Sequence, residues 1–443
     1  MNIRLSDHFT YPRLMRFVLP SITMMIVTSV YSIVDGFFVS NFVGKSAFAA
    51  VNLIMPFLMA LGAFGFMIGT GGSALVARKL GEGNEKEASR YFSMLVYVTA
   101  VVGIVLSAAG FIFLRPIAAA LGANDVILDE CVVYGRILLA SNTAFMLQNA
   151  FQSFLVAAER PKLGLAVSVI AGLLNIVLDF LLVYVFPMGL TGAAVATAVS
   201  QIIGAIIPLV YFLTQKSAVL RLVRAPFDGK VLLKSCANGS SEMLTNISTS
   251  FVGMLYNFQL MKLAGENGVA AYGVIMYVNF IFMAFYFGFS VGSSPLISYH
   301  YGAENHQELR GLFRKSLVVI GAAAMAMTLL AELLAQPLSG LFVGYDAELF
   351  AMTCTAFRLY SLSFLIAGFN IFGSAFFTAL NNGVLSAAIS VLRTLVFQIA
   401  AILILPILFG TNGIWIAITV AEGLTLAVTA ALLIVKRKQY RYM

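Results

Sequence analysis

Four polar side chains in the first half of the sequence have the types and the spacing to bind a cation or a proton. Asn175 and Asp179 are four residues apart in the apolar stretch LLNIVLDFLL, so a helix would place both on one face. Asp35 lies in another apolar stretch, and Thr197 lies in the small-residue stretch GAAVATAVS, which permits close helix packing. Their carboxylate, amide and hydroxyl oxygens are hard ligands, suited to a sodium ion or a proton. Burial and mutual repulsion of the two carboxylates would favour a bound proton on at least one of them.

The segments that must hold these residues are long and apolar. The 443 residues are 60% hydrophobic and 10% charged, with a mean hydropathy of +0.95, whereas an ordinary globular domain has about 25% charged residues. We therefore predict an all-α polytopic membrane protein without a separate cleavable signal sequence. Apolar runs of about 20 residues or more predict twelve transmembrane helices. They lie near residues 14–40, 51–77, 91–114, 126–157, 162–186, 191–214, 232–261, 269–299, 315–335, 348–379, 384–408 and 412–435.

The basic residues alternate between the two ends of these predicted helices. Most Lys and Arg residues outside the spans fall in the N-terminus, the even-numbered loops and the C-terminal tail. The opposite side carries only Lys45, Arg115 and Lys262. The positive-inside rule then places both termini in the cytoplasm. The net charge of +8 is therefore explained by topology, and no nucleic-acid partner is expected.

The sequence consists of two copies of one unit. A shift of 221 residues aligns GTGGSALVARKLGEGNEKE (69–87) with SVGSSPLISYHYGAENHQE (290–308), and GLTGAAVATAV (189–199) with GTNGIWIAITV (410–420). We predict two pseudo-symmetric six-helix lobes, residues 1–220 and 221–443, related by an axis near the membrane normal and suited to alternating access. The same shift replaces the four polar residues by Tyr256, Val396, Ala400 and Ile418, which cannot bind an ion in the same way. The ion-coupling site is therefore predicted in the first lobe alone.

Other ionisable residues within or near the predicted helices leave two interpretations open. Such residues mark functional sites, because the bilayer penalises them, or they form internal salt bridges that fix packing. They are Glu242, Glu422, Arg136, Arg358 and Arg393.

The cysteine and histidine residues indicate neither a metal centre nor a cofactor. Cys131, Cys236 and Cys354 have no CxxC spacing, which argues against a zinc or iron–sulfur site. The three histidines, His8, His300 and His306, lie outside the predicted spans. No cofactor is expected beyond the coupling ion.

Several motifs give the chain a resemblance to the multidrug and toxic compound extrusion (MATE) family, and it is similar to the bacterial MepA-like branch. The motifs are the first-helix proline with VDGFFVS (34–40), ALVARKLGEGN (74–84), and NIVLD (175–179) followed by GAAVATA (192–198). The resemblance implies a V-shaped pair of lobes that antiports amphipathic, often cationic compounds against sodium or protons. It implies a multi-pass protein of the bacterial inner (plasma) membrane, expected to be a monomer in the lipid bilayer. In the family's ion site the matching positions, which are also the candidate sodium ligands, are Asp35, Asn175, Asp179 and Thr197, with Tyr134 as a hydrogen-bonding neighbour.

The sequence departs from the family pattern in its second lobe. Some branches of the family use an acidic pair there, and the nearest candidate, Glu242, lies about two helical turns earlier than that glutamate would align. Further polar residues at helical spacing could line a substrate cavity or bond helix to helix, and both interpretations stay open. With Glu242, the candidates for the cavity are Gln148, Gln152, Asn257 and Asn279.

Two other functions compete with export. A flippase for lipid-linked oligosaccharides would need cationic residues for a pyrophosphate in its cavity, whereas basic residues are depleted away from the predicted cytoplasmic face. A membrane-embedded enzyme is disfavoured, because the sequence has no HExxH motif. The chain also lacks a Walker A motif, so an ion gradient is the expected source of energy.

Overall fold

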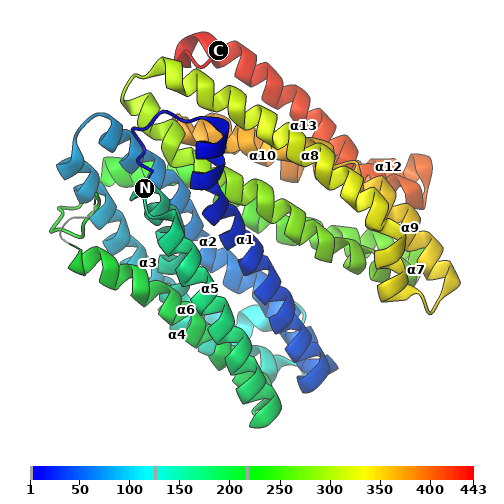
Figure 1. Cartoon of the computed structure of the whole chain (residues 1–443). Helices are drawn as coiled ribbons and strands as arrows, with labels where there is room; N and C mark the ends of the chain where they lie inside the picture. The colour runs from blue at the N-terminus through cyan, green and yellow to red at the C-terminus, as the bar shows by residue number, and fades with distance from the viewer. Residues whose placement is uncertain (1–2, 124–126, 216–218) are drawn as a thin grey trace.

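The computed structural model describes residues 3–123, 127–215 and 219–443, and within these ranges the chain forms helices and no strands (Figure 1). Three π-helical segments, η1, η2 and η3, continue α1, α5 and α11. The bounds are α1 Tyr11–Phe38, η1 Val39–Val43, α2 Lys45–Gly81, α3 Glu85–Ala120, α4 Leu128–Ala157, α5 Pro161–Asp179, η2 Phe180–Val185, α6 Gly189–Thr214, α7 Gly229–Gly302, α8 His306–Val343, α9 Ala347–Ser361, α10 Phe364–Ala379, α11 Gly383–Val391, η3 Leu392–Phe397, α12 Gln398–Phe409 and α13 Thr411–Tyr440.

The number of long apolar helices agrees with a polytopic membrane protein. Among the described residues, nine helices are long and apolar enough to cross a membrane, or ten if α9 and α10, bent by 42°, form one span. The α7 segment counts once but contains two antiparallel helices joined at Gly265, whose φ of 60° suits glycine. Its two arms are held side by side by stacking of Tyr256 on Tyr272, with ring centroids 5.0 Å apart. α4 is less apolar because amides such as Asn142, Gln148 and Gln152 lie along it. With α4 included, each predicted span coincides with a helix, with one arm of α7 or with a group of consecutive helices.

The helices form two lobes that meet at one end of the molecule, which confirms the predicted fold class. Figure 1 shows α1–α6 in one lobe and α7–α13 in the other, close together near both chain termini and diverging towards the opposite end. The boundary at residue 220 stays a prediction.

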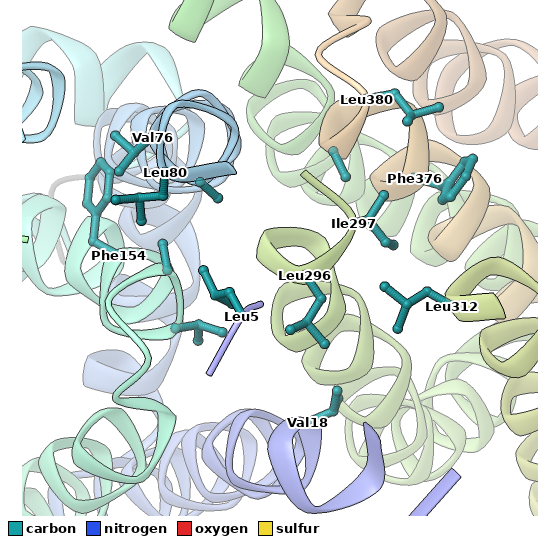
Figure 2. Packing of buried hydrophobic residues seen from close by; sticks show 14 of the residues in the cluster. Leu5, Val18, Val76, Leu80, Phe154, Leu296, Ile297, Leu312, Phe376 and Leu380 are labelled. Carbon is teal, nitrogen blue, oxygen red and sulfur yellow. The ribbon is translucent and has the colours of Figure 1, made fainter. Parts of the chain in front are cut away.

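The hydrophobic cores explain this V shape. One buried cluster contains residues of both lobes, including Leu80 and Phe154 from the first and Ile297 and Phe376 from the second (Figure 2). Two other clusters belong to a single lobe each: one lies around Tyr134 in the first, the other around Trp415 in the second. The lobes therefore share a core at the end that carries the termini and have separate cores beyond it.

Two glycines allow the lobes to touch backbone to backbone at this closed end. A methyl group added to Gly71 of α2 would overlap the carbonyl oxygen of Ser235, and one added to Gly239 of α7 would overlap that of Met67. Asn238 reinforces the contact, because its amide donates to the carbonyl of Gly71 at 3.4 Å and to that of Thr378 at 2.9 Å. Such close approach maximises van der Waals contact between helices in a bilayer.

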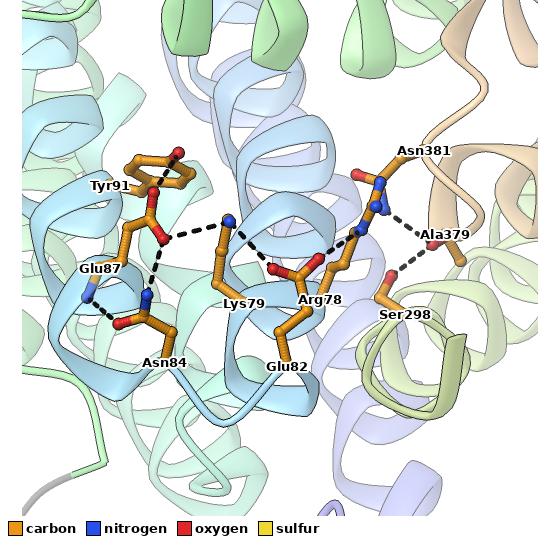
Figure 3. Close-up of polar contacts among 9 residues, drawn as sticks. All are labelled: Arg78, Lys79, Glu82, Asn84, Glu87, Tyr91, Ser298, Ala379 and Asn381. Carbon is orange, nitrogen blue, oxygen red and sulfur yellow. Dashed lines mark hydrogen bonds and ion pairs between the residues drawn. The ribbon is translucent and has the colours of Figure 1, made fainter. Parts of the chain in front are cut away.

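The duplicated loop motif serves the two lobes differently. Asn84 and Asn305 each cap the following helix by accepting from the backbone N–H three residues later, at 3.2 and 3.1 Å. In the first lobe, Glu87 of that motif pairs with Lys79 at 3.1 Å within the network of Figure 3. In the second lobe, Glu308 instead accepts from the backbone N–H of Phe9 at 2.8 Å.

The segment before α1 therefore ties the lobes together at the closed end. Its backbone donates to Glu159 of the first lobe through Leu5, at 2.7 Å, and to Glu308 of the second lobe through Phe9. The side chains of Leu5 and Phe9 are buried in the shared core.

Candidate ion site and cavities

The structure brings three of the predicted ion-site residues into a hydrogen-bonded chain. Thr197 of α6 donates through Oγ1 to Asp35 Oδ1 of α1 at 3.3 Å and accepts from Asn175 Nδ2 of α5 at 3.5 Å. Helix packing thus unites residues that are 162 positions apart in the sequence. The role of this cluster in ion coupling stays a prediction.

Asp179 is the fourth residue of the predicted ion site. Its side chain is fully buried (0% exposed), and no N–H or O–H donor of the described residues reaches either carboxylate oxygen. The carboxyl groups of Asp35 and Asp179 are neighbours and interact electrostatically. Two neighbouring carboxylates repel each other when both are ionised. The pair is therefore suited to holding one proton or one cation.

Irregular helix geometry surrounds the carboxylate pair. Asp179 is the last residue of α5 before the π-helical segment η2, and Asp35 lies one turn before η1. A π-helical turn inserts a residue into the α-helical register, and such insertions are frequent at functional sites. Nothing in the apolar sequences of these segments signals the change, so sequence reasoning missed it.

A cavity of about 110 Å³ inside the first lobe gives access to this cluster. Asp35, Asn175 and Thr197 line it, whereas Asp179 does not. Tyr134 is fully buried beside the cluster, yet its hydroxyl donates to Met55 Sδ at 4.0 Å, and no hydrogen bond joins it to either aspartate. The structure therefore places Tyr134 next to the site without a direct contact.

The second lobe carries different chemistry. Arg393 of η3 pairs with Glu422 of α13, with Nε and a terminal nitrogen both 2.8 Å from Oε1, and Asn370 Nδ2 donates to the other carboxylate oxygen at 2.7 Å. Of the other arginines, Arg358 lies 4.0 Å from Glu332, and Arg136 lies over the ring of Phe111 at 5.2 Å. For Arg393 and Glu422 the geometry is that of an internal salt bridge, one of the two interpretations that the sequence left open.

The candidate cavity residues separate into different environments. Gln148 and Gln152 of α4 are buried, and Gln148 lies against Gly204 of α6, as expected of a contact between helices. Asn257 is exposed, and Asn279 donates to Met276 Sδ at 4.0 Å within its own helix. The four amides therefore do not line one common cavity in this conformation.

Glu242 lies at the junction of the lobes. It lines a void of about 20 Å³, roughly the room for one water molecule, with hydroxyls from both lobes. No ion-pair partner lies within 4.0 Å of its carboxylate in the described part of the chain. The hydroxyl residues around it are Thr70, Ser73, Ser153, Ser290, Ser294 and Thr378.

Two lobes of six spans with a carboxylate pair inside one lobe define a class of protein, the polytopic membrane proteins of the MATE fold. The fold matches a crystal structure of MATE in complex with MaL6, with a TM-score of 0.93 and 21% identity over 99% of this chain and 98% of the other. It also matches an outward-facing conformation of a multidrug resistance MATE family transporter of the MOP superfamily, with a TM-score of 0.93, 21% identity and the same coverage.

The family follows from the sequence match. The MatE family model matches the chain twice, over residues 20–181 and 243–404, once in each lobe, and the chain belongs to this family. It is 24% identical over 430 residues to the multidrug export protein MepA of Staphylococcus aureus (strain MSSA476), which covers 96% of this chain and 93% of that protein. The resemblance drawn from the motifs is thereby confirmed.

Proposed function

We propose that this protein exports amphipathic, often cationic compounds across the bacterial plasma membrane in exchange for sodium ions or protons. The carboxylate pair of Asp35 and Asp179 is the observation that supports this proposal most directly. Asp179 and the Oδ1 atom of Asn175 are buried acceptors that no donor of the described residues satisfies. Unsatisfied buried oxygens are costly unless a proton or a cation occupies the site.

Helix α1 is the element through which ion binding would act on the lobes. It carries Asp35, packs on α5 within its own lobe and approaches α7 of the other lobe, where Gly288 lies against the backbone of Ile22. Pro20 lies in the same helix and removes one backbone hydrogen bond, which lowers the cost of bending there. Neutralising the carboxylate pair would let α1 repack. Ion and substrate would then compete, because the binding of each depends on the position of this helix.

Transport driven by an imposed gradient is the expected result in proteoliposomes. The purified protein should move a lipophilic cationic dye when a sodium gradient or a proton gradient is imposed separately, because binding at the carboxylate pair couples ion and substrate movement. Dye fluorescence in the vesicles measures the rate, and protein-free vesicles are the control. Equal dye movement with and without both gradients would refute ion coupling, and export of an anionic lipid-linked sugar in place of dye would favour a flippase.

We propose that the closed end, with both termini, faces the cytoplasm. In a background with Cys131, Cys236 and Cys354 replaced by Ser, a cysteine at Arg224 should react with a membrane-impermeant thiol reagent only after the cells are opened. A cysteine at Lys262 should react in intact cells, because it lies near the hairpin at Gly265 that joins the two arms of α7, away from the closed end. The reverse pattern of labelling would invert the orientation and the direction of transport.

A further inference from the structure

A large groove lies between the first turns of α1 and α5 at the closed end. Its volume is about 950 Å³, far larger than the cavity at the carboxylate pair. It shares no lining residue with the cavity at the carboxylate pair or with the void around Glu242. The lining residues are Ile3, Thr10, Pro12, Arg13, Arg16, Phe17, Leu19, Pro20, Thr23, Glu159, Arg160, Pro161, Lys162, Leu163 and Leu165.

The groove has an excess of positive charge that the protein does not neutralise. Arg13 pairs with Asp7 at 2.7 Å, and Arg160 uses only its Nε to donate to Tyr211 at 3.1 Å. Arg16 and Lys162 are exposed and have no ion-pair partner within the described residues. The first turns of α1 and α5 contain no acidic residue, so the partial positive charges of two helix N-termini add to the field.

The single acidic residue among those that line the groove is already engaged. Glu159 accepts from the backbone N–H of Leu5 at 2.7 Å. Burial raises the pKa of Glu159 above its usual range. Arg16 and Lys162 therefore have no ion-pair partner among the described residues of the groove.

Apolar side chains continue the groove from the cations along the helices. Leu19, one turn after Arg16 on α1, is 52% exposed, and Leu163 and Leu165 follow Lys162 on α5. A soluble anion would contact only the basic residues of the groove. A ligand with a negative head and a hydrocarbon tail would contact both parts.

We propose that this groove binds an anionic phospholipid from the leaflet on the side of the termini. Arg16 and Lys162 hold the phosphate group, and the acyl chains lie on Leu19, Leu163 and Leu165. Basic pockets between transmembrane helices recognise lipid headgroups in this way, with long basic side chains reaching to the interface. Because Pro20 lines the same groove, the bound lipid contacts the helix that carries Asp35.

The second lobe supplies a matched control. The shift of 221 residues relates Arg16 to Ala237, Arg160 to Asn381 and Lys162 to Gly383, so three of the four cations are lost. The cavity at that place, about 540 Å³, is lined by four cations, Arg78, Lys79, Lys230 and Lys234, but also by Asp228 and Glu82. Glu82 pairs with Arg78 at 3.0 Å and with Lys79 at 2.9 Å, so the protein supplies acidic partners there. Lipid selectivity is therefore expected in the first lobe only.

Native mass spectrometry of the protein released from nanodiscs with equal amounts of phosphatidylglycerol and phosphatidylcholine tests the proposal. The wild-type protein should retain phosphatidylglycerol in preference to phosphatidylcholine. The R16Q/K162Q variant should lose this preference by roughly tenfold or more, because each cation near an anionic headgroup contributes to binding. The K230Q/K234Q variant of the second lobe should retain it, and both variants should melt like the wild type in nanodiscs of phosphatidylcholine alone.

Three results would overturn the lipid site. Equal retention of both lipids by the wild type would show that the groove does not select charge. Equal losses in R16Q/K162Q and K230Q/K234Q would show that the basic residues act only through overall charge and topology. Displacement of phosphatidylglycerol by millimolar inorganic phosphate would show that the groove binds a free anion and not a lipid.

Discussion

Replacing Asp179 by Asn, or Asp35 by Asn, should reduce gradient-driven efflux to the level of protein-free vesicles. Asn keeps the size of the side chain and much of its hydrogen bonding but cannot titrate. Asp179→Asn would fix the site in a state like the protonated one, and Asp35→Asn would remove the carboxylate that lines the cavity. In both variants the pair could no longer alternate between a charged and a neutral state.

The two variants are compared with substitutions at the mirror positions in the second lobe. Tyr256→Phe and Ala400→Ser should transport at rates near wild type, because no carboxylate pair lies there. Dye efflux under separate sodium and proton gradients gives the rates, and thermal melting of the purified proteins checks that all four variants fold. Wild-type rates in both Asp variants would mean that the first-lobe site is not the coupling site, and Glu242 would then be the first residue to test.

Substituting Gly239 by Ala should prevent the lobes from closing at the end with the termini. The added methyl group would overlap the backbone carbonyl oxygen of Met67, which cannot move aside as a flexible side chain can. Overpacking of this kind costs about 1–3 kcal/mol or more. The equilibrium between the closed and open states of this end should therefore shift by about tenfold or more towards open, with a corresponding loss of efflux.

Gly253→Ala, on the same arm of α7, is the matched control, because nothing lies within 4 Å of a methyl group there. A cysteine introduced at Ser294, which lines the void between the lobes, reports the state of the closed end through its rate of reaction with a thiol reagent. That rate should rise in Gly239→Ala and stay unchanged in Gly253→Ala. Gly71→Ala, on the opposite lobe, should behave like Gly239→Ala, and normal efflux in both would show that the backbone contact is not required for closure.

The sequence by itself determined the class of fold and the members of the oxygen cluster. Apolar spans and the sided distribution of basic residues are local features that the bilayer imposes on any chain that crosses it. The repeat at a fixed offset of 221 residues predicted two equivalent lobes. The spacing of Asn175 and Asp179 placed both on one helix face, because four residues make about one turn.

Only the tertiary structure decided which polar residues become partners. Arg393 and Glu422 are 29 positions apart on different helices, and their pairing depends on how η3 and α13 pack. Tyr134 donates to Met55 instead of an aspartate, and Glu242 lies among hydroxyls of both lobes instead of in a second ion site of its own lobe. Such contacts follow from the crossing angles and separations of packed helices, which residue spacing within one helix does not encode.

The tertiary structure also decided which end of the bundle is closed. The short segment from Leu5 to Phe9 has no hydropathy signal, yet its backbone joins Glu159 to Glu308 across the lobes. Gly71 and Gly239 look like ordinary small residues in the sequence, and only the structure shows the opposing backbone that leaves no room for a larger side chain. Each lobe could form from its own apolar pattern, but the contact between lobes is fixed by shape complementarity of surfaces that are distant in sequence.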